Sequence, residues 1–240
     1  MKLNIANIKF SNKPIIVSAL SDEDIKLVKR QELKFVGLIE LRVDTFKDVS
    51  PSYVEGVFKH VKKRFKKPLL GTVRDIKEGG KRLLSENQRL ELFKTIAPIA
   101  DVIDIELNSK IYGQVAQIAH SKGKSIIASY HNFKETPDSV TLSKLLSKAK
   151  SASPEIIKFA TMANNLDDVG RLLCFTIEHM NEHIVSISLG EKGRLSRVIN
   201  PLFGSLLTYG YIGKPKADGQ MHVKQLVEMI KFLQRINVDN

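Results

Sequence analysis

The chain has 240 residues, of which 42% are hydrophobic and 27% are charged, and its formal net charge is +12. This composition provides for a sizeable buried core and excludes an intrinsically disordered chain. We expect neither a secretory leader nor a membrane span, because no apolar run approaches the ~20 residues that a span needs. The single cysteine, Cys174, excludes an intrachain disulfide and favours a reducing, cytoplasmic location. We expect its side chain to be buried as a small hydrophobe.

The positive charge could indicate a nucleic-acid partner. However, the lysines are spread over the whole chain, and the one dense run, over residues 59–67, comes late in a predicted helix. Cations at that position complement the helix dipole. The run also lacks aromatic residues in a stacking pattern, which single-stranded nucleic acids require. We therefore expect no nucleic-acid partner, and the charge suits an anionic small-molecule substrate.

The predicted elements alternate regularly after a short start. Residues 3–10 form two alternating pieces and predict a short N-terminal β-hairpin. Polar capping residues then mark helix starts at Ser21, Ser50, Ser85 and Asn165. Three further helices are predicted near residues 110–122, over 141–151 and over 223–236. Eight strands are predicted over 15–18, 35–42, 68–74, 101–107, 125–129, 155–160, 184–188 and 206–209.

Eight strand–helix units of roughly 30 residues each match the size of a (β/α)8 TIM barrel. The near-continuous apolar strands fit a parallel sheet that helices cover. No low-complexity linker divides the chain, so we expect residues 1–240 to form a single domain. An open doubly wound sheet is the alternative, but it has fewer units as a rule, and no Gly-x-Gly-x-x-Gly follows a strand here.

Lys158 lies in the middle of the apolar strand over residues 155–160. Burial disfavours the ammonium form of lysine and lowers its pKa. In one interpretation, the side chain snorkels from the strand end to water. In the other, desolvation and nearby arginines lower the pKa so that the neutral amine can attack a carbonyl carbon. Lys158 alone leaves both interpretations open.

Polar residues follow most of the predicted strands, where the active site of a barrel lies. His131 ends the strand next to that of Lys158, which makes it a candidate general base. The other histidines lack metal-ligand spacing, so we predict no metal site. The polar residues at the strand ends are Ser18, Glu40, Arg42, Arg74, Asp104, Glu106, Ser129, His131, Lys158, Ser188 and Arg197.

Several motifs together resemble those of type I 3-dehydroquinate dehydratase, in the order and spacing of that family from about residue 15 to the C-terminus. The chain departs from the family pattern at Lys216, where serine is usual, at Asp218, where proline is usual, and at Leu189, where methionine is common. The motifs are Glu40-Leu41-Arg42-Val43-Asp44, Thr72-Val73-Arg74 with Glu78-Gly79-Gly80, Ser129-Tyr130-His131-Asn132-Phe133, Ile157-Lys158, Ser196-Arg197 and Gly219-Gln220.

The resemblance implies dehydration of 3-dehydroquinate to 3-dehydroshikimate through an iminium on Lys158. His131 would be the general acid and base, Glu78 would orient it, and Arg197 would clamp the substrate carboxylate. The resemblance also implies a cytoplasmic homodimer without cofactor. A Schiff-base aldolase acting on a related keto acid is the alternative, less suited to His131 and to two arginines facing a carboxylate. The expected substrate contacts are Ser18, Glu40, Arg42, Arg74, Arg197, Lys216 and Gln220.

Overall fold

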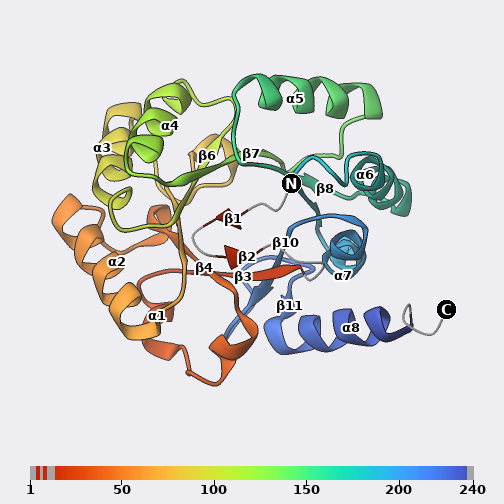
Figure 1. Ribbon diagram of the computed structural model, residues 1–240, viewed down its shortest axis with the longest axis horizontal. Helices are drawn as coiled ribbons and strands as arrows, with labels where there is room; N and C mark the ends of the chain where they lie inside the picture. The colour runs from red at the N-terminus through yellow and green to blue at the C-terminus, as the bar shows by residue number, and fades with distance from the viewer. Residues whose placement is uncertain (1–3, 6–7, 10–13, 237–240) are drawn as a thin grey trace.

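The structure is a computed structural model, and it describes residues 4–5, 8–9 and 14–236. A parallel sheet of nine strands curls around the centre of the molecule, and the helices form a ring outside it (Figure 1). The strand order is β11-β10-β3-β4-β5-β6-β7-β8-β9, so β3 to β9 neighbour one another in chain order, and β10 pairs with β3. This arrangement confirms the predicted barrel-type α/β fold.

The eight predicted strands correspond to β3 through β10, with boundaries that differ by a few residues. A ninth strand, β11, pairs with β10 and was not predicted. The strands of the sheet are β3 (Ile15–Leu20), β4 (Leu38–Arg42), β5 (Leu69–Thr72), β6 (Val102–Glu106), β7 (Ser125–Asn132), β8 (Ile156–Met162), β9 (Ile184–Leu189), β10 (Leu207–Tyr211) and β11 (Met221–His222).

Most helix starts follow their capping residues. Ser85 caps its helix as predicted, in a capping box with Gln88, and the Asn165 side chain accepts a hydrogen bond from the backbone of Asp168. The helix predicted from residue 141 begins at Ser139, because the Asp138 side chain caps it. The helices are α1 (Asp24–Leu27), α2 (Pro51–Phe65), α3 (Glu86–Ile96), α4 (Tyr112–Ser121), α5 (Ser139–Ser151), α6 (Leu166–Glu178), α7 (Ser196–Ile199) and α8 (Val223–Ile236), with 3-10 turns η1 (Glu32–Phe35), η2 (Val43–Thr45), η3 (Ile76–Glu78), η4 (Lys192–Leu195) and η5 (Asn200–Phe203).

The structure differs from an ideal closed barrel in two places. In the described residues no strand ladder joins β9 to β10; one backbone hydrogen bond, from Leu206 N to Ile184 O at 2.9 Å, links them. At the N-terminus, β1 (Asn4–Ile5) pairs antiparallel with β2 (Ile8–Lys9) in a separate two-stranded sheet. The other residues of the predicted hairpin lie outside the described part of the chain.

The inner face of the sheet changes character along the strands. Near the strand starts it carries apolar side chains such as Leu38, Leu70, Val102 and Ile156, which pack together inside the barrel. Successive side chains on a strand alternate between faces. The residues two positions further along each strand therefore also face inward. These inward residues are Glu40, Asp104 and Lys158, and Glu106 faces inward two positions beyond Asp104. These apolar side chains form the floor of the barrel interior (the apolar floor), and a layer of charged groups lies above it at the carboxyl ends of the strands.

Cys174 is exposed, which contradicts the prediction that it is buried. It lies on α6, whose buried stripe includes Val169, Leu172 and Phe175. Position 174 is two residues from Leu172, and residues two apart on a helix point in nearly opposite directions. Helical phase, and not the hydrophobicity of the thiol, decides the exposure of this side chain.

Candidate active site

Strand register brings the charged residues of neighbouring strands into one layer. On β6 and β7, Glu106 is paired with Ser129, and Ser129 is in turn paired with Lys158 on β8. On the other side of β6, Asp104 is paired with Thr72 of β5. Side chains from β5 to β8 therefore meet above the apolar floor, as predicted for the carboxyl end of a barrel.

Lys158 is buried, with 4% of its surface exposed. Its Nζ donates hydrogen bonds to Asp104 Oδ2 and to the Tyr209 hydroxyl, each at 3.1 Å. The Nζ atom also lies over the Tyr209 ring, 4.6 Å from its centroid, at a distance typical of a cation–π contact. The amine does not reach water, so the snorkelling interpretation is wrong.

The expectation that the pKa of Lys158 is lowered is also wrong for this structure. Burial by itself lowers that pKa, but the Asp104 carboxylate, the Tyr209 hydroxyl and Glu40 outweigh burial. Arg74 opposes them from the same layer. The net effect raises the pKa of Lys158 above its usual value. The free site therefore holds an ammonium ion, because one carboxylate at hydrogen-bond distance offsets the cost of desolvation.

Asp104 joins Lys158 to a larger buried network. Its Oδ1 accepts hydrogen bonds from Arg74 Nη2 and from Ser129 Oγ, both at 2.7 Å. Arg74 Nη1 also donates to Glu106 Oε1 at 2.9 Å, and Glu106 in turn pairs with the buried Arg89. Burial raises the pKa of Asp104, but Arg74 and Lys158 outweigh it and hold that pKa well below its usual range.

His131 is oriented by Glu78, as the family resemblance implies. Glu78 Oε2 accepts from the His131 backbone N–H at 2.9 Å and lies 3.1 Å from His131 Nδ1. A carboxylate at Nδ1 favours the tautomer in which Nδ1 carries the hydrogen, which leaves Nε2 as a free base. Burial, Arg74 and Lys158 together lower the pKa of His131 well below its usual value, although Asp104 opposes them. The imidazole is therefore neutral near pH 7.

Glu78 has a raised pKa of about 7. Burial is the main cause, and the nearby Glu106 carboxylate adds to it, whereas Arg74 and the His131 backbone N–H oppose it. Glu78 also lines a small cleft that contains Asp75, Lys77 and Glu106. This acid therefore changes its protonation state in the pH range in which histidine usually does.

Arg197 is buried on α7 and contacts no carboxylate in the described residues. Its Nε donates to Gly219 O at 3.0 Å and its Nη1 to Tyr209 O at 3.3 Å. Burial lowers the pKa of Arg197 to about 10. A buried guanidinium that is bonded only to carbonyl groups retains capacity for an anion.

The other predicted contacts divide into two groups. Glu40 and Arg74 bond to protein groups: Glu40 Oε1 accepts from Thr72 Oγ1 at 2.7 Å, and Arg74 belongs to the buried network. Arg42 is paired with Asp44 through Nε and Nη2, at 2.9 and 2.8 Å, yet keeps 24% of its side chain exposed. Its face toward the site is therefore accessible.

A cavity of about 200 Å³ lies above the charged layer. It is lined by Arg42, Tyr209, Lys216 and Gln220, among others, and therefore brings three of the predicted substrate contacts together. Lys158 is not among the lining residues, but Tyr209, which accepts its hydrogen bond, is. Tyr209 therefore both contacts the buried amine and contributes to the wall of the cavity.

The structure does not bring Ser18 to this cavity. Ser18 shares a face of β3 with Ile16 and Leu20, which pack in the core between the sheet and the helices. Its Oγ is buried and has no hydrogen-bond partner in the described residues. The neighbouring Ala19 and Ser21 line the cavity instead.

The loop between β10 and β11 covers one side of the cavity. Lys216, at the position where the family resemblance leads one to expect serine, forms an ion pair with Asp24, and its backbone N–H donates to Gln220 Oε1 at 2.7 Å. Gly219 has a φ of +72°, and a Cβ built there would lie 2.1 Å from Gly190 O. Only glycine fits this approach, so the loop is seated closely on the turn after β9.

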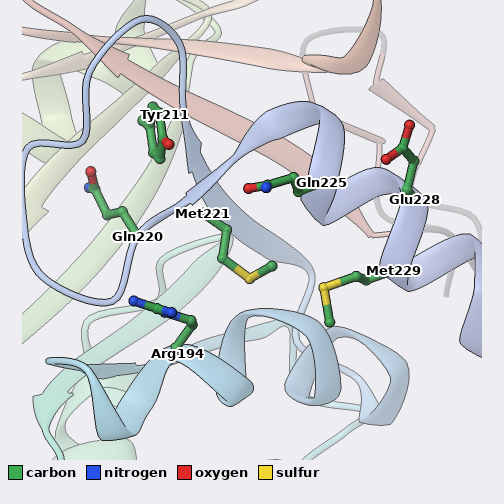
Figure 2. A pocket seen from close by; sticks show the side chains of 7 residues that line it. All are labelled: Arg194, Tyr211, Gln220, Met221, Gln225, Glu228 and Met229. Carbon is green, nitrogen blue, oxygen red and sulfur yellow. The ribbon is translucent and has the colours of Figure 1, made fainter.

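Gln220 also borders a second, wider cleft on the far side of the loop (Figure 2). In this cleft, Met221 and Met229 project from β11 and α8, and Arg194 projects from η4. The cleft is open and of mixed polarity. Gln220 is therefore positioned at the boundary between the cavity and the outer surface.

Sequence reasoning missed Tyr209 as a site residue and used Asp104 and Glu106 only as strand-end polar residues. Strand alternation could have indicated Tyr209, because Leu207 and Tyr209 share the inner face of β10. Arg89, on α3, had no such signal: its guanidinium reaches the layer from outside the sheet, through Val73 O and Glu106.

Two features are absent from the described part of the chain. No group of three or more histidine, cysteine, aspartate or glutamate side chains in that part of the chain is arranged to hold a metal ion. Likewise, none of the described helices combines the length and the apolar character needed to cross a membrane.

The raised pKa of Glu78 predicts a pH dependence of stability. The pKa is 4.5 for an ordinary glutamate and about 7 in the folded chain, so the folded state binds this proton more tightly than the unfolded state. The contribution of Glu78 to stability is therefore full below pH 4.5 and is lost as the pH rises to about 7. Glu78→Gln removes this titration. Between pH 5 and pH 8, the free energy of unfolding of the variant should rise relative to wild type by more than about 1 kcal/mol.

Urea unfolding at both pH values measures this difference. Glu91→Gln, at an exposed site on α3, is the matched control and should track wild type. A difference between Glu78→Gln and wild type that stays constant from pH 5 to pH 8 would show that Glu78 does not titrate in this range.

Comparison with known proteins agrees with this geometry. A family model described as type I 3-dehydroquinase matches residues 14–237. The 3-dehydroquinate dehydratase of Thermodesulfovibrio yellowstonii is 36% identical over 222 residues, which cover 92% of this chain and 96% of the relative. The corresponding enzyme of Aquifex aeolicus is 36% identical over 210 residues, covering 87% of this chain and 93% of the relative.

Solved structures show the same relationship. The crystal structure of the type I 3-dehydroquinate dehydratase from Clostridium difficile, solved with covalently modified comenic acid, has a TM-score of 0.88 and 29% identity, and covers 98% of each chain. That of the 3-dehydroquinate dehydratase from Geobacillus kaustophilus has a TM-score of 0.91 at 24% identity, covers 100% of this chain and 98% of its own, and by itself shows the shared fold. The match of the family model over nearly the whole chain and the relatives above 30% identity lead to one conclusion: this chain belongs to the type I 3-dehydroquinase family.

Proposed function

We propose that this chain dehydrates 3-dehydroquinate to 3-dehydroshikimate through a Schiff base on Lys158. The observation that carries the proposal is the buried amine of Lys158, which is hydrogen-bonded to Asp104 and Tyr209. Lys158 lies on β8, next to the strand that carries His131. The substrate is a cyclic ketone with a carboxylate and hydroxyl groups, which suits a basic cavity. Membership of the family and the names of its relatives support the same reaction.

Lys158 supplies the chemistry that activates the ketone. Its nitrogen bonds to the carbonyl carbon, and loss of water leaves an iminium. The cationic nitrogen acidifies the adjacent C–H, because the electron pair left behind delocalises into it as an enamine. The enamine then expels the β-hydroxyl. Hydrolysis of the resulting imine releases the conjugated enone and restores the lysine.

His131 moves the proton in this elimination. The low pKa of its imidazole keeps Nε2 unprotonated at neutral pH, as a general base requires. After it takes the proton from the carbon, the same nitrogen can deliver that proton to the leaving hydroxyl as water forms. Glu78, at 3.1 Å from Nδ1, fixes the ring and stabilises the imidazolium that forms during turnover.

The remaining predicted residues position the substrate. Arg197 is the proposed carboxylate clamp, because it is buried and its hydrogen bonds go to backbone carbonyls of β10 and of the loop between β10 and β11. Arg42, Lys216 and Gln220 line the cavity and supply donors for hydroxyl groups. Glu40 and Arg74 remain proposed contacts. Because both side chains already bond to protein groups, each would have to bind the substrate in addition to these partners. Ser18 stays a proposal that its position in this structure does not support.

The proposed reaction needs no metal and no cofactor, because amine and imidazole provide the electrophile and the base. A Schiff-base aldolase would use the same lysine to cleave a carbon–carbon bond, but the family of this chain does not favour it. An ultraviolet assay for the conjugated enone product distinguishes the two, since only the dehydratase forms it from 3-dehydroquinate. Activity in this assay should persist with EDTA present.

The Schiff base predicts a covalent adduct on one lysine. Borohydride reduces an imine to a stable secondary amine, so its addition during turnover should leave one adduct per chain on the peptide with Ile157, Lys158 and Phe159. Mass spectrometry of the digested protein locates it. Lys158→Ala should lose both adduct and activity, and Lys158→Arg should do no better, because arginine stays charged at every working pH.

Lys144→Ala, at an exposed site on α5, is the control and should keep adduct and activity. An adduct on another lysine, or activity that survives Lys158→Ala, would exclude the mechanism proposed here.

The base assignment predicts a separate phenotype for His131→Ala. The variant should still form the borohydride-trapped adduct, because Lys158 is intact, but turnover in the enone assay should fall by about 10²–10⁴-fold. His60→Ala, which changes an exposed histidine on α2, should behave as wild type. Near-full activity of His131→Ala would mean that His131 is structural and that another group is the base.

We propose further that the protein is a cytoplasmic homodimer, as the family resemblance implies. The single cysteine suits a reducing compartment. Exposed apolar side chains on α8, Met229 at 43% and Phe232 at 66%, offer surface that a second copy could cover. Light scattering should give a mass near twice the 27.0 kDa of the chain. A mass that stays at 27.0 kDa at micromolar concentration would contradict the dimer.

A further inference from the structure

The amine assigned to Schiff-base formation is hydrogen-bonded to the buried Asp104 carboxylate in the free site. The raised pKa of Lys158 means that the reacting nitrogen must lose a proton before it can bond to a carbonyl carbon. In the described residues, Nζ has two hydrogen-bond partners, Asp104 Oδ2 and the Tyr209 hydroxyl. These two groups are therefore the direct hydrogen-bonded candidates to take the proton.

Asp104 is a poor proton acceptor. Its carboxylate also accepts hydrogen bonds from Arg74 and Ser129, and Arg74 and Lys158 hold its pKa well below the usual range. A proton placed on Asp104 would deprive the buried Arg74 of one of its two charged partners, which is strongly unfavourable in a buried network. Asp104 stabilises the ammonium and does not remove its proton.

Tyr209 is placed to pass a proton on. Its oxygen accepts from Nζ at 3.1 Å, and in the described residues its own hydroxyl hydrogen has no protein acceptor. Tyr209 also lines the cavity, whereas Lys158 does not. The hydroxyl bonded to Nζ thus belongs to a residue of the cavity wall, and its hydrogen has no acceptor among the described residues.

We propose that the Tyr209 hydroxyl is a catalytic proton relay between Lys158 Nζ and the substrate carbonyl oxygen during iminium formation. The inference rests on the proposed Schiff base. It adds to that mechanism a hydroxyl in direct contact with the reacting nitrogen.

The relay operates twice, and each step conserves atoms and charge. In the first, Nζ gives a proton to the Tyr209 oxygen, Tyr209 gives its own proton to the carbonyl oxygen, and the freed nitrogen lone pair bonds to the carbonyl carbon. In the second, Nζ gives another proton to Tyr209, which protonates the new hydroxyl. That group leaves as water with the C–O bonding pair, and the nitrogen lone pair forms the C=N bond. One ammonium and one ketone thus give one iminium and one water, with no proton exchanged with solvent.

Burial keeps the relay intact over the working range. Burial raises the pKa of Tyr209, and Glu40 and Asp104 add to this effect, so the phenol stays protonated. The other groups that face the Lys158–Tyr209 pair are Arg74 and His131, with Glu78 behind His131. Glu78 titrates near pH 7, but it does so with or without the Tyr209 hydroxyl. Its effect therefore cancels when a Tyr209 variant is compared with wild type.

The test is the rate at which the borohydride-trapped Lys158 adduct forms from 3-dehydroquinate, in rapid-quench single turnovers from pH 6 to pH 9. Tyr209→Phe keeps the ring under Nζ and removes only the hydroxyl. Without the relay, the amine must first lose a proton to solvent, and its neutral fraction rises tenfold per pH unit below its pKa. The ratio of wild-type to variant rate should therefore fall about tenfold per pH unit, from about 10²-fold at pH 7.

Tyr112→Phe, which removes a hydroxyl on α4 that donates to Ala152 O, is the matched control and should match wild type. Equal rates for Tyr209→Phe and wild type would overturn the relay. A constant ratio across pH would overturn it as well, because it would mean that the hydroxyl only positions Lys158.

The wild-type profile is a second test that does not depend on the folding of a variant. A flat rate of adduct formation with pH supports the relay, and a tenfold rise per pH unit overturns it. A failure of the Schiff base itself would look different, since no adduct would form on Lys158 in the wild-type protein.

Discussion

The hydrogen-bonded charge layer around Asp104 is the constraint on which the site depends. Three cations, Arg74, Arg89 and Lys158, and three anions, Glu40, Asp104 and Glu106, are each less than 5% exposed. Burying a lone charge costs several kcal/mol, and removal of one partner from a buried pair typically costs about 3–5 kcal/mol. Six charges survive here because they balance and because hydrogen bonds link five of them in a chain, while Glu40 bonds to the neighbouring Thr72. No member can change its charge without a cost to the others.

This layer sets the protonation states that the chemistry starts from. Asp104 keeps Lys158 charged. Burial, together with the positive charges of Arg74 and Lys158, keeps His131 neutral. A neutral imidazole, the proposed base, and a charged amine, the proposed nucleophile, therefore lie on adjacent strands. The base is ready for carbon-acid chemistry, whereas the nucleophile needs a route for its proton. Tyr209 is the neutral hydroxyl that touches that nucleophile, which is why it, and not another ionised group, is suited to the transfer.

The apolar floor and the loop between β10 and β11 enclose the site from two sides. Leu70, Val102 and Ile156 fill the barrel below the charges, so water does not reach Lys158 from that end. On the open side, Arg197 and Gly219 tie the loop before β11 to the rest of the site. Lys216, the departure from the family pattern, adds an ion pair with Asp24 across the cavity mouth. The loop thus has an anchor in this chain where the usual proline is replaced by the exposed Asp218.

Much of this protein follows from its sequence alone. The alternation of apolar strands with capped helices determines the order of the elements, since periodicity and capping are local properties. The motifs around Glu40, His131 and Lys158 likewise indicate the family before any coordinates are considered. The tertiary structure alone decided the charge environment of Lys158 and the positions of Tyr209, Arg89 and Ser18. A pKa depends on which charges lie within a few ångströms, and strand register brings Asp104 to Lys158 from 54 residues away. The same holds for the direction of Ser18 and the exposure of Cys174, because the face of an element that turns to the core is settled by its packing, not by the residue itself.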